Sequence, residues 1–188
     1  LVYVREPLPA TAASARVFFP PRGLPPNKGA VVCRVDVGGR TVDLAACHLA
    51  HDEDKNALRL EQIGAVAERV GECGFIFGDL NFRVVYPRQY ALDAVAAGAF
   101  AGLLAGDQLV VAMRDSPALQ GFREGPVLFP PTCKFDPDSD VYDTSSKQRT
   151  PSYTDRIVFR GAVDCRVYES LECRLSAHRP VLGVFDLR

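Results

Sequence analysis

The sequence predicts an α/β domain in which helices cover mixed β-sheets. Three observations lead to this prediction. Strand-like apolar runs outnumber helical segments, two of these runs are joined by a tight turn, and helical segments lie between others. The chain has 188 residues, of which 47% are hydrophobic and 24% are charged. These values are typical of one globular domain with a buried core.

The first part of the chain alternates between strand and helix patterns. Short β-type runs at 2–4 and 16–19 are accompanied by a Pro/Gly-rich stretch, which predicts a loop. The run AVVCRVDV (30–37) and the apolar run that follows two glycines predict a β-hairpin. Residues 53–70 repeat apolar side chains at helical spacing, which predicts an amphipathic helix.

The second part contains a strand, a helical region and a long polar segment before it returns to strands. FIFGDL (75–80) predicts a strand, and the Ala-rich residues 87–106 predict a helical region interrupted by glycines. Residues 127–152 are rich in Pro, Asp and Ser, and a structureless segment of this length in a compact domain is often functional. The runs RIVFR, VDCRVYES and RPVLGVFDL predict a strand-rich end.

Charge and hydropathy exclude several classes of protein. The formal net charge is -1, so no overall basic field indicates a nucleic-acid partner. No run approaches the eighteen apolar residues of a transmembrane helix. The opening LVYVREPLPA lacks a signal-peptide pattern and a Met, and it begins inside a strand-like run. We therefore expect the chain to be a fragment of a longer protein.

The six cysteines are scattered and form no CxxC pair, which disfavours a zinc site. Most of them lie in apolar, strand-like runs. We interpret them as free, buried, reduced thiols of a cytosolic protein, with disulfides as the alternative.

Polar and ionisable residues stand beside strand-like runs in four short stretches, where sites in layered α/β domains are often found. The stretches are CHLAHDED (47–54), FGDLNFR (77–83), RTPSYTDRIVFR (149–160) and LSAHRPVLGVF (175–185). The candidate site residues within them are His48, Asp79, Asn81, Asp155 and His178.

This set suits phosphoryl chemistry. A carboxylate such as Asp79 can take a proton from an attacking water, and an amide such as Asn81 can orient that water or a phosphate oxygen. A histidine held by a second carboxylate can stabilise charge on the phosphoryl group. Hard oxygen ligands together with phosphate imply Mg²⁺. Taken one by one, these residues also fit turn caps, a core histidine and a surface ion pair, and their combination and order favour the site.

The stretches FGDLNFR and RTPSYTDRIVF together closely resemble the paired signature of the inositol-polyphosphate 5-phosphatases. This family belongs to the endonuclease/exonuclease/phosphatase superfamily, with a DNase I-like fold. NKGAVVCRV, CHLAHDED, the long polar segment and SAHRPV resemble further family motifs, so the resemblance covers essentially residues 1–188. It implies a four-layer sandwich of two mixed β-sheets flanked by helices, with the first strands missing. It also implies that 1–188 form the C-terminal two-thirds of a single catalytic domain.

The resemblance assigns a role to each candidate catalytic residue. Asp79 resembles the general base for water, and Asn81 resembles the amide that positions water and phosphate. His178 resembles the imidazole that stabilises the transferring phosphoryl group, and Asp155 resembles the carboxylate that orients it. His48 resembles a phosphate-contacting histidine.

The same resemblance places basic residues around a second phosphate. Lys134, Lys147 and Arg149 match the family's residues for the inositol 4-phosphate, and a substrate with neighbouring phosphates needs such cations. Arg83 and Arg156 are motif arginines, which we interpret as structural ion-pair partners rather than catalytic groups.

Three departures from the family pattern bear on the metal and on a hydrogen bond to a substrate phosphate. The motifs that supply a Mg²⁺-binding Glu are absent from the chain. Ala177 replaces an Asp that lies by the metal in the family, and Cys133 replaces a Tyr of the substrate loop. A methyl group cannot ligate Mg²⁺, so no metal ligand is assigned with certainty within the chain.

The sequence thus predicts a Mg²⁺-dependent phosphatase that removes the 5-phosphate from phosphoinositides, such as phosphatidylinositol 4,5-bisphosphate, or from inositol polyphosphates. The alternative is a catalytically weak or inactive phosphoinositide-binding relic, which Ala177 favours. A nuclease of the same superfamily is disfavoured by the polar segment and by the net charge. The sequence indicates no nucleic-acid partner and identifies no protein partner.

The predicted substrate implies a cytoplasmic protein at the cytosolic face of a membrane, associated peripherally. Two apolar stretches, FFPPRGL (18–24) and LFPP (128–131), are possible membrane-contacting tips. We interpret their residues Phe18, Phe19 and Phe129 as core instead, and no amphipathic helix with a basic face stands out.

Overall fold

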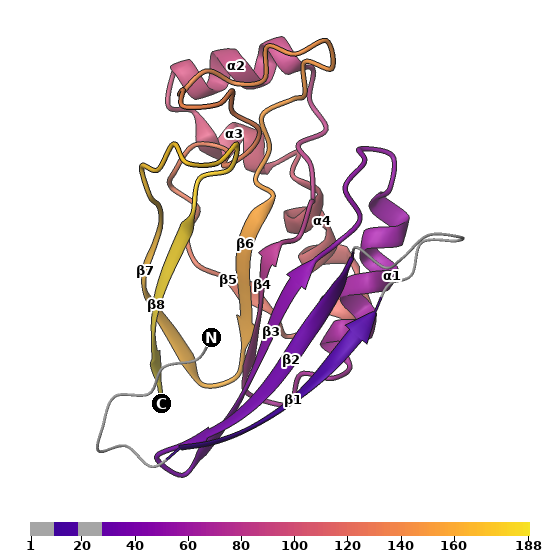
Figure 1. The fold of residues 1–188 in the computed structure, drawn as a ribbon, viewed down its shortest axis with the longest axis vertical. Helices are drawn as coiled ribbons and strands as arrows, with labels where there is room; N and C mark the ends of the chain where they lie inside the picture. The colour runs from indigo at the N-terminus through magenta and orange to yellow at the C-terminus, as the bar shows by residue number, and fades with distance from the viewer. Residues whose placement is uncertain (1–9, 19–27) are drawn as a thin grey trace.

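The computed structural model describes residues 10–18 and 28–188, in which a large and a small β-sheet are accompanied by helices (Figure 1). The larger sheet has the order β1-β2-β3-β4-β6-β5. Its strands are β1 Ala10–Phe18, β2 Gly29–Val37, β3 Arg40–His48, β4 Gly74–Asp79, β6 Asp155–Arg160 and β5 Arg123–Glu124. The smaller sheet pairs β7 Val163–Ser170 with β8 Val181–Leu187. The helices are α1 Asn56–Ala67, α2 Arg88–Ala96, α3 Phe100–Leu104, α4 Gln108–Asp115 and the 3-10 helix η1 Pro117–Leu119.

The pairing of the larger sheet confirms the predicted α/β fold with a mixed sheet. β3 and β4 are parallel, whereas β1 with β2, β2 with β3, β4 with β6 and β5 with β6 are antiparallel. A parallel pair needs a crossover connection, and α1 lies in it. The predicted hairpin is β2 and β3, and its turn places Gly38 and Gly39 at positive φ, as a tight hairpin requires.

The smaller sheet differs from the expected second mixed sheet, because β7 and β8 are an antiparallel pair. The loop between them runs from 171 to 180. A parallel crossover needs about a dozen residues or more, so this ten-residue connection (171–180) favours reversal of the chain. The loop lies at the end of the molecule where β3 and β4 finish (Figure 1).

The strands and helices differ from the sequence prediction mainly in their ends. The strand predicted at 16–19 is the longer β1, and the helix predicted over 53–70 is the shorter α1. The run at 2–4 and most of the Pro/Gly-rich loop lie outside the described residues. The helical region 87–106 divides into α2 and α3 at Gly98, whose φ is +66°.

Helix α4 was not predicted, although its start carries a sequence signal. The side chain of Asp107 accepts hydrogen bonds from the backbone N–H groups of Leu109 and Val110, as an N-cap residue does. An Asp before a short apolar run is that signal. Among the described residues, no helix has the length and apolar character needed to cross a membrane.

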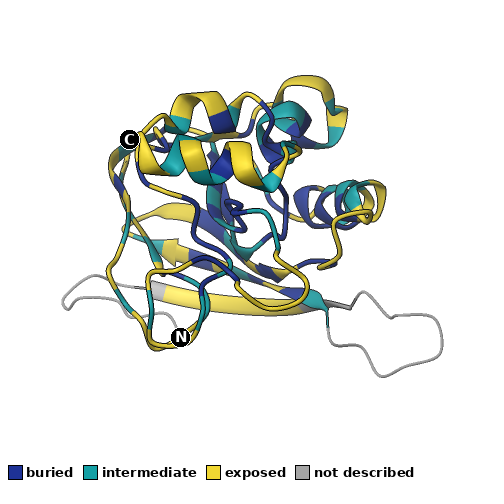
Figure 2. Ribbon diagram, turned by 90° about the horizontal axis from the view of Figure 1, so that it is seen from above, coloured by how far each residue is buried: buried dark blue, intermediate teal, exposed yellow. Residues whose placement is uncertain are grey.

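The core lies on both faces of the larger sheet, as the dark blue residues of Figure 2 show between the outer elements. Because strand residues alternate between faces, Ile76 of β4 points to the side of α1 and α4, where it joins Ile63 and Leu109. Phe75 points to the opposite side and packs on Phe185 of β8, with ring centroids 4.9 Å apart. Aromatic packing of this kind holds the two sheets together.

The cysteines are free thiols, which confirms that part of the expectation. Cys47 and Cys133 are buried, whereas Cys33, Cys73, Cys165 and Cys173 are half-buried. The expectation of general burial was therefore wrong for four of the six. Cys33 and Cys165 occupy half-buried positions of β2 and β7, Cys73 directly precedes β4, and Cys173 lies in the loop between β7 and β8.

A buried ion cluster links the larger sheet to its surroundings. The guanidinium of Arg156 donates to Asp107 at 2.8 Å and to Glu124 at 2.6 Å, and the Arg156 and Asp107 side chains are fully buried. Glu124 also accepts a hydrogen bond from the Tyr168 hydroxyl at 2.6 Å. The interpretation of Arg156 as a structural ion-pair partner is confirmed by these contacts.

We expect Arg156→Met to lower the free energy of unfolding by about 3–5 kcal/mol, because it leaves two buried carboxylates without their cation. Urea denaturation measures the change. The matched control is Arg166→Met, which removes an exposed pair with Asp186 and costs about 1 kcal/mol or less. Equal losses in the two variants would contradict the structural role of the cluster.

Candidate active site

Strand register brings three of the predicted residues into one row. His48 at the end of β3 pairs with Asp79 at the end of β4, and Asp79 pairs with Asp155 at the start of β6. Paired residues on neighbouring strands point to the same face of a sheet. The row therefore lies on the face turned toward β8, and the loop before β8 carries His178 to it.

A hollow of about 300 Å³ opens at this row. Asp79, Asp155 and His178 line it, together with apolar side chains from β4, β6 and β8. The stretch after β4 is shaped by Gly78, where φ is +120° and a Cβ would lie 2.3 Å from the carbonyl oxygen of Cys47. A side chain at Gly78 would push β3 and β4 apart, so this glycine permits the close approach of the two strand ends.

His178 and Asp155 form a hydrogen-bonded pair. Nδ1 of His178 lies 2.9 Å from an Asp155 carboxylate oxygen, and that oxygen also accepts from the Thr132 and Thr154 hydroxyls at 2.7 and 2.8 Å. The hydrogen bond to Asp155, and then the contact with Cys133, raise the pKa of His178 to about 10. His178 is therefore an imidazolium at neutral pH, held in a fixed orientation.

The surroundings of Asp79 disfavour its charged form, whereas those of His178 favour the charged imidazolium. Burial raises the pKa of its carboxyl group, and the neighbouring Asp155 carboxylate adds to that rise. His178 and His48 act against it, and His48 Nε2 lies 3.4 Å from an Asp79 oxygen. A carboxylate with a raised pKa is a stronger proton acceptor once it is ionised, which suits a base.

The other histidine of the site, His48, has a lowered pKa. Burial lowers the pKa of His48, and the ammonium of Lys28 lowers it further. Lys28 Nζ contacts His48 Nε2 directly. Two histidines of one site thus have pKa values displaced in opposite directions, an arrangement that assigns different protonation states to them.

Asn81 lies in the predicted place, but its side chain faces away from the Asp79 oxygens. Its Nδ2 donates to the Leu49 carbonyl at 3.2 Å, and its Oδ1 accepts from Arg83 Nη2 at 2.5 Å. Its backbone N–H donates to Asp79 Oδ1 at 3.1 Å. In this structure Asn81 therefore positions Asp79 through the backbone, at a left-handed φ of +57° that asparagine tolerates.

The two departures from the family pattern lie beside His178. Cys133 Sγ is 3.4 Å from His178 Nε2, and Cys133 is buried. Ala177 is tied by its carbonyl to the backbone N–H of Phe135 at 2.9 Å, and its methyl side chain provides no ligand. Nδ1 of His178 contacts Asp155, and Nε2 on the other side of the ring contacts the Cys133 thiol. The resemblance places a tyrosine phenol at that position.

The predicted 4-phosphate cations are divided between two places. Lys147 and Arg149 line a hollow of about 290 Å³ with Arg83, His51, Asp52 and Glu53. Arg149 is anchored to Asp143 at 3.0 Å. Arg83, interpreted above as structural, donates to the His51 carbonyl at 2.7 Å as well as to Asn81. Asn81 therefore links this basic hollow to Asp79.

Lys134 does not line the basic hollow. It follows Cys133 in the chain, and its carbonyl accepts the backbone N–H of Asp143 at 2.9 Å. Its backbone thus lies between Cys133, which contacts His178, and Asp143, whose carboxylate pairs with Arg149. The structure brings together the five predicted catalytic residues and two of the three predicted cations.

The carboxylates of the row fit a hard divalent cation. Asp79, Asp155 and His178 each offer a ligand atom within 4.8 Å of the others. An imidazolium is a poor ligand, and the Asp155 oxygens already accept several hydrogen bonds, so Asp79 is the donor best able to bind. Mg²⁺ is commonly held by one or two carboxylates together with substrate phosphates and water, which agrees with this donor set.

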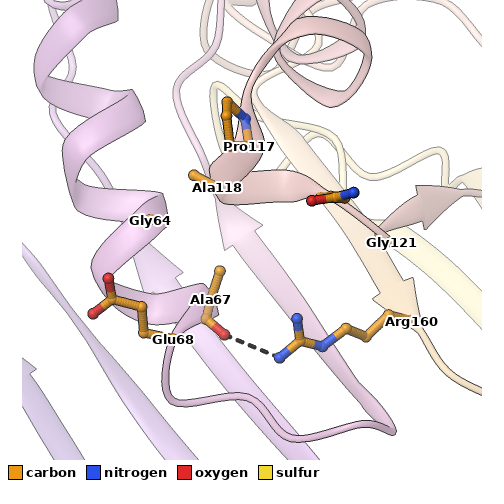
Figure 3. A pocket seen from close by; sticks show the side chains of 8 residues that line it. Gly64, Ala67, Glu68, Pro117, Ala118, Gly121 and Arg160 are labelled. Carbon is orange, nitrogen blue, oxygen red and sulfur yellow. Dashed lines mark hydrogen bonds between the residues drawn. The ribbon is translucent and has the colours of Figure 1, made fainter.

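A larger hollow of about 600 Å³ lies elsewhere, between α1 and η1 (Figure 3). None of the predicted site residues lines it. Its cation, Arg160, donates to the Ala67 carbonyl at 3.1 Å and to the Gly71 carbonyl at 2.7 Å. This hollow carries no group suited to the predicted chemistry.

Comparison with protein-family models identifies the class of the chain. Residues 3–184 match the family described as "Endonuclease/Exonuclease/phosphatase family 2", and the chain belongs to this family. The family resemblance found in the sequence is thereby confirmed.

Relatives with curated names are inositol phosphatases. The chain is 33% identical to inositol-1,4,5-trisphosphate 5-phosphatase 1 of Schizosaccharomyces pombe over 87% of its length and 16% of the relative. It is 32% identical to inositol polyphosphate 5-phosphatase K of Mus musculus, over 86% of the chain and 42% of the relative. It is 37% identical to phosphatidylinositol 4,5-bisphosphate 5-phosphatase A of Homo sapiens, over 86% of the chain and 19% of the relative. The chain thus spans less than half the length of each of these relatives.

Solved structures show the same fold. The inositol polyphosphate 5-phosphatase domain of Spsynaptojanin, in complex with inositol (1,4)-bisphosphate and a calcium ion, matches with a TM-score of 0.84 and 29% identity. The match covers 94% of the chain and 56% of that domain. A Cimex nitrophorin in its ferrous NO complex matches with a TM-score of 0.77 and 26% identity. This match covers 93% of the chain and 63% of the nitrophorin chain. Since the fold occurs with different functions, the function must be argued from the site.

Three polar residues of the site were missed by the sequence interpretation. Lys28 contacts His48, and the hydroxyls of Thr132 and Thr154 hold Asp155. Lys28 could have been predicted from the sequence, because it precedes Gly29, and the predicted hairpin pairs Gly29 with His48. The pairing of Thr132 with Asp155 crosses the long polar segment, and nothing in the local sequence indicates it.

We expect His178 and His48 to titrate at separate pH values, and nuclear magnetic resonance of their imidazoles measures this. His178 titrates near pH 10 and His48 below its ordinary range. In Asp155→Asn the pKa of His178 falls, because its acceptor is no longer charged. An unchanged pKa of His178 in that variant would contradict the assigned pairing.

Proposed function

We propose that the chain is part of a phosphoric monoester hydrolase domain that removes the 5-phosphate from inositol polyphosphates or phosphoinositides. The observation that carries this proposal is the pairing of a base-like Asp79 with an Asp155-held His178 imidazolium across one hollow. The names of the relatives support the substrate class.

The site residues divide the reaction between them. Asp79, ionised above its raised pKa, accepts the proton of a water that attacks the phosphorus atom. The Nε2–H of His178 donates to a phosphoryl oxygen and stabilises the charge that develops there. His48, with its lowered pKa, contacts the phosphate as a neutral imidazole. Asn81 keeps Asp79 in place through its backbone N–H.

We propose Mg²⁺ as the cation, which one oxygen of Asp79 would hold together with water and phosphate oxygens, while the other Asp79 oxygen accepts the proton. When bound, it supplies Lewis-acid stabilisation of the phosphoryl charge. The calcium ion in the Spsynaptojanin domain supports a divalent cation at this class of site. A second carboxylate at position 177 would strengthen the site, and Ala177 lacks it.

The substrate is proposed to be phosphatidylinositol 4,5-bisphosphate or a soluble inositol polyphosphate. Lys147 and Arg149 face the basic hollow that Asn81 and Arg83 connect to Asp79. We propose that these two cations bind a phosphate next to the reacting one. A lipid substrate would put the protein in the cytoplasm, peripherally at the cytosolic face of a membrane, and no nucleic-acid partner is proposed.

The second candidate is a phosphoinositide-binding module with little or no turnover, which Ala177 favours. The deciding experiment measures phosphate release by the full-length protein from phosphatidylinositol 4,5-bisphosphate and inositol 1,4,5-trisphosphate, in Mg²⁺ and in EDTA. We expect release in Mg²⁺, loss in EDTA, and a fall of about 10²–10⁴ in Asp79→Asn, because the base is removed.

Ala177→Asp separates the two candidates. We expect this variant to lower the Mg²⁺ concentration for half-maximal rate by about tenfold, since it adds a carboxylate near the site. Release by Ala177→Asp and none by the natural sequence would favour the binding module. No release by any form would overturn the substrate class.

We expect Lys147→Ala to reduce kcat/KM by about tenfold on substrates with a 4-phosphate, because a charged hydrogen bond is lost. On a substrate with the 5-phosphate alone, phosphatidylinositol 5-phosphate, the variant should equal the natural protein. The control Lys55→Ala removes an exposed pair with Asp54 and should change neither rate. Equal losses of kcat/KM on both substrates would show that Lys147 does not bind the 4-phosphate.

A further inference from the structure

The basic hollow carries two carboxylates that the proposed function does not use. Its lining includes three cations, Arg83, Lys147 and Arg149, and two acids, Asp52 and Glu53. The Asp52 side chain is 55% exposed, and Glu53 is exposed as well. A hollow that only attracts phosphate has no need of acidic groups, because they repel the ligand. The two acids therefore need an explanation of their own.

The backbone that carries these acids is held by two arginines. Four consecutive carbonyl oxygens, those of residues 50–53, accept hydrogen bonds from guanidinium groups. Arg59, which is fully buried, donates to three of them at 2.6–3.3 Å. Arg83 donates to the fourth, that of His51, at 2.7 Å. The side chains of Asp52 and Glu53 consequently project from a fixed backbone.

The acids are also fixed relative to the cations of the hollow. Gln108 Oε1 accepts a hydrogen bond from Arg59 Nη2 at 2.8 Å and another from the backbone N–H of Arg83 at 3.0 Å. The loop that carries the acids and the segment that carries Arg83 thus share one anchor. A loop tied in this way is not free to move aside when an anion enters the hollow.

The charges at the hollow balance. Arg149 pairs with Asp143 at 3.0 Å, and the Asp143 side chain is only 1% exposed. With Asp143 added to the two lining acids, three carboxylates stand against the three lining cations. A phosphate that contacts the cations is still attracted locally. A further phosphate finds no surplus of positive charge.

The two lining acids are not neutralised by other parts of the protein. Across residues 10–18 and 28–188, neither the Asp52 nor the Glu53 carboxylate forms an ion pair with a lysine or an arginine. Asp52 lies 3.2 Å from Nε2 of His51, its neighbour in the chain. An ion-pair role within the fold therefore does not account for these acids, and their charge remains directed at whatever enters the hollow.

We propose that Asp52 and Glu53 are specificity-determining residues, which disfavour inositol phosphates that carry a 3-phosphate beside the 4- and 5-phosphates. This inference rests on the proposed function, because it takes the basic hollow as the place of the 4-phosphate. The 3-position adjoins the 4-position on the inositol ring, so a 4-phosphate in the hollow brings a 3-phosphate to its edge. Fixed like charges discriminate between ligands by repelling one of them.

The experiment compares two soluble substrates that differ only in the 3-phosphate, inositol 1,3,4,5-tetrakisphosphate and inositol 1,4,5-trisphosphate. The measured quantity is the ratio of their kcat/KM values for the natural full-length protein and for the double variant Asp52→Asn, Glu53→Gln. The matched control is Asp54→Asn, in the same loop, because Asp54 pairs with Lys55 at 2.8 Å and does not line the hollow. Thermal melting verifies that the variants are folded.

We expect the ratio of tetrakisphosphate to trisphosphate to rise about tenfold in the double variant, because two repulsive charges are removed. The rise should shrink as salt is added, since the acids are exposed and are screened. Asp54→Asn should leave the ratio as in the natural protein. The corresponding ratio for phosphatidylinositol 3,4,5-trisphosphate and 4,5-bisphosphate in vesicles tests lipid headgroups. A rise in either pair supports the proposal and identifies the source of the ligand.

An unchanged ratio for both pairs in the double variant would overturn the proposal. An equal rise in Asp54→Asn would overturn it too, because the effect would then come from overall charge. If no form releases phosphate from any substrate, the proposed function fails. Calorimetric binding of the two soluble inositol phosphates to the same variants still decides whether Asp52 and Glu53 discriminate against the 3-phosphate.

Discussion

The pairing of β4 with β3 on one side and β6 on the other is the constraint on which the site depends. It sets His48, Asp79 and Asp155 side by side, although they come from positions far apart in the chain. The parallel half of this pairing needs α1 as its crossover, and the close approach of β3 and β4 needs Gly78. The fold therefore determines the spacing of the catalytic groups before any side chain is oriented.

The electrostatics of the row follow from this spacing. Asp79 and Asp155 are close enough for one carboxylate to raise the pKa of the other. Asp155 is held by two hydroxyls and by His178, whose pKa it raises, so Asp79 becomes the group that can exchange a proton. Two similar side chains acquire different roles because the hydrogen-bond donors around them differ.

The sequence allowed the strands, the mixed sheet and the members of the row to be predicted, because apolar periodicity and short motifs are local. The orientation of Asn81 could not be predicted, since both of its amide atoms bond to groups brought in by tertiary contacts, Leu49 and Arg83. The separation of Lys134 from Lys147 likewise depends on how the long polar segment turns. The antiparallel small sheet depends on the length of its connecting loop.

The surroundings of His178 indicate which of two residues that differ from the family pattern, Ala177 or Cys133, matters more for the chemistry. Position 177 lies on a backbone hydrogen-bonded to Phe135, so a carboxylate there would be carried on a fixed segment next to His178. Cys133 already touches His178 Nε2, the nitrogen that must reach the phosphate. A thiol sulfur is a weaker hydrogen-bond acceptor than a phenol oxygen, so it competes little with phosphate for the Nε2–H. The loss at position 177 is therefore expected to weaken the proposed cation site, whereas the change at 133 is expected to leave the imidazolium available to the substrate.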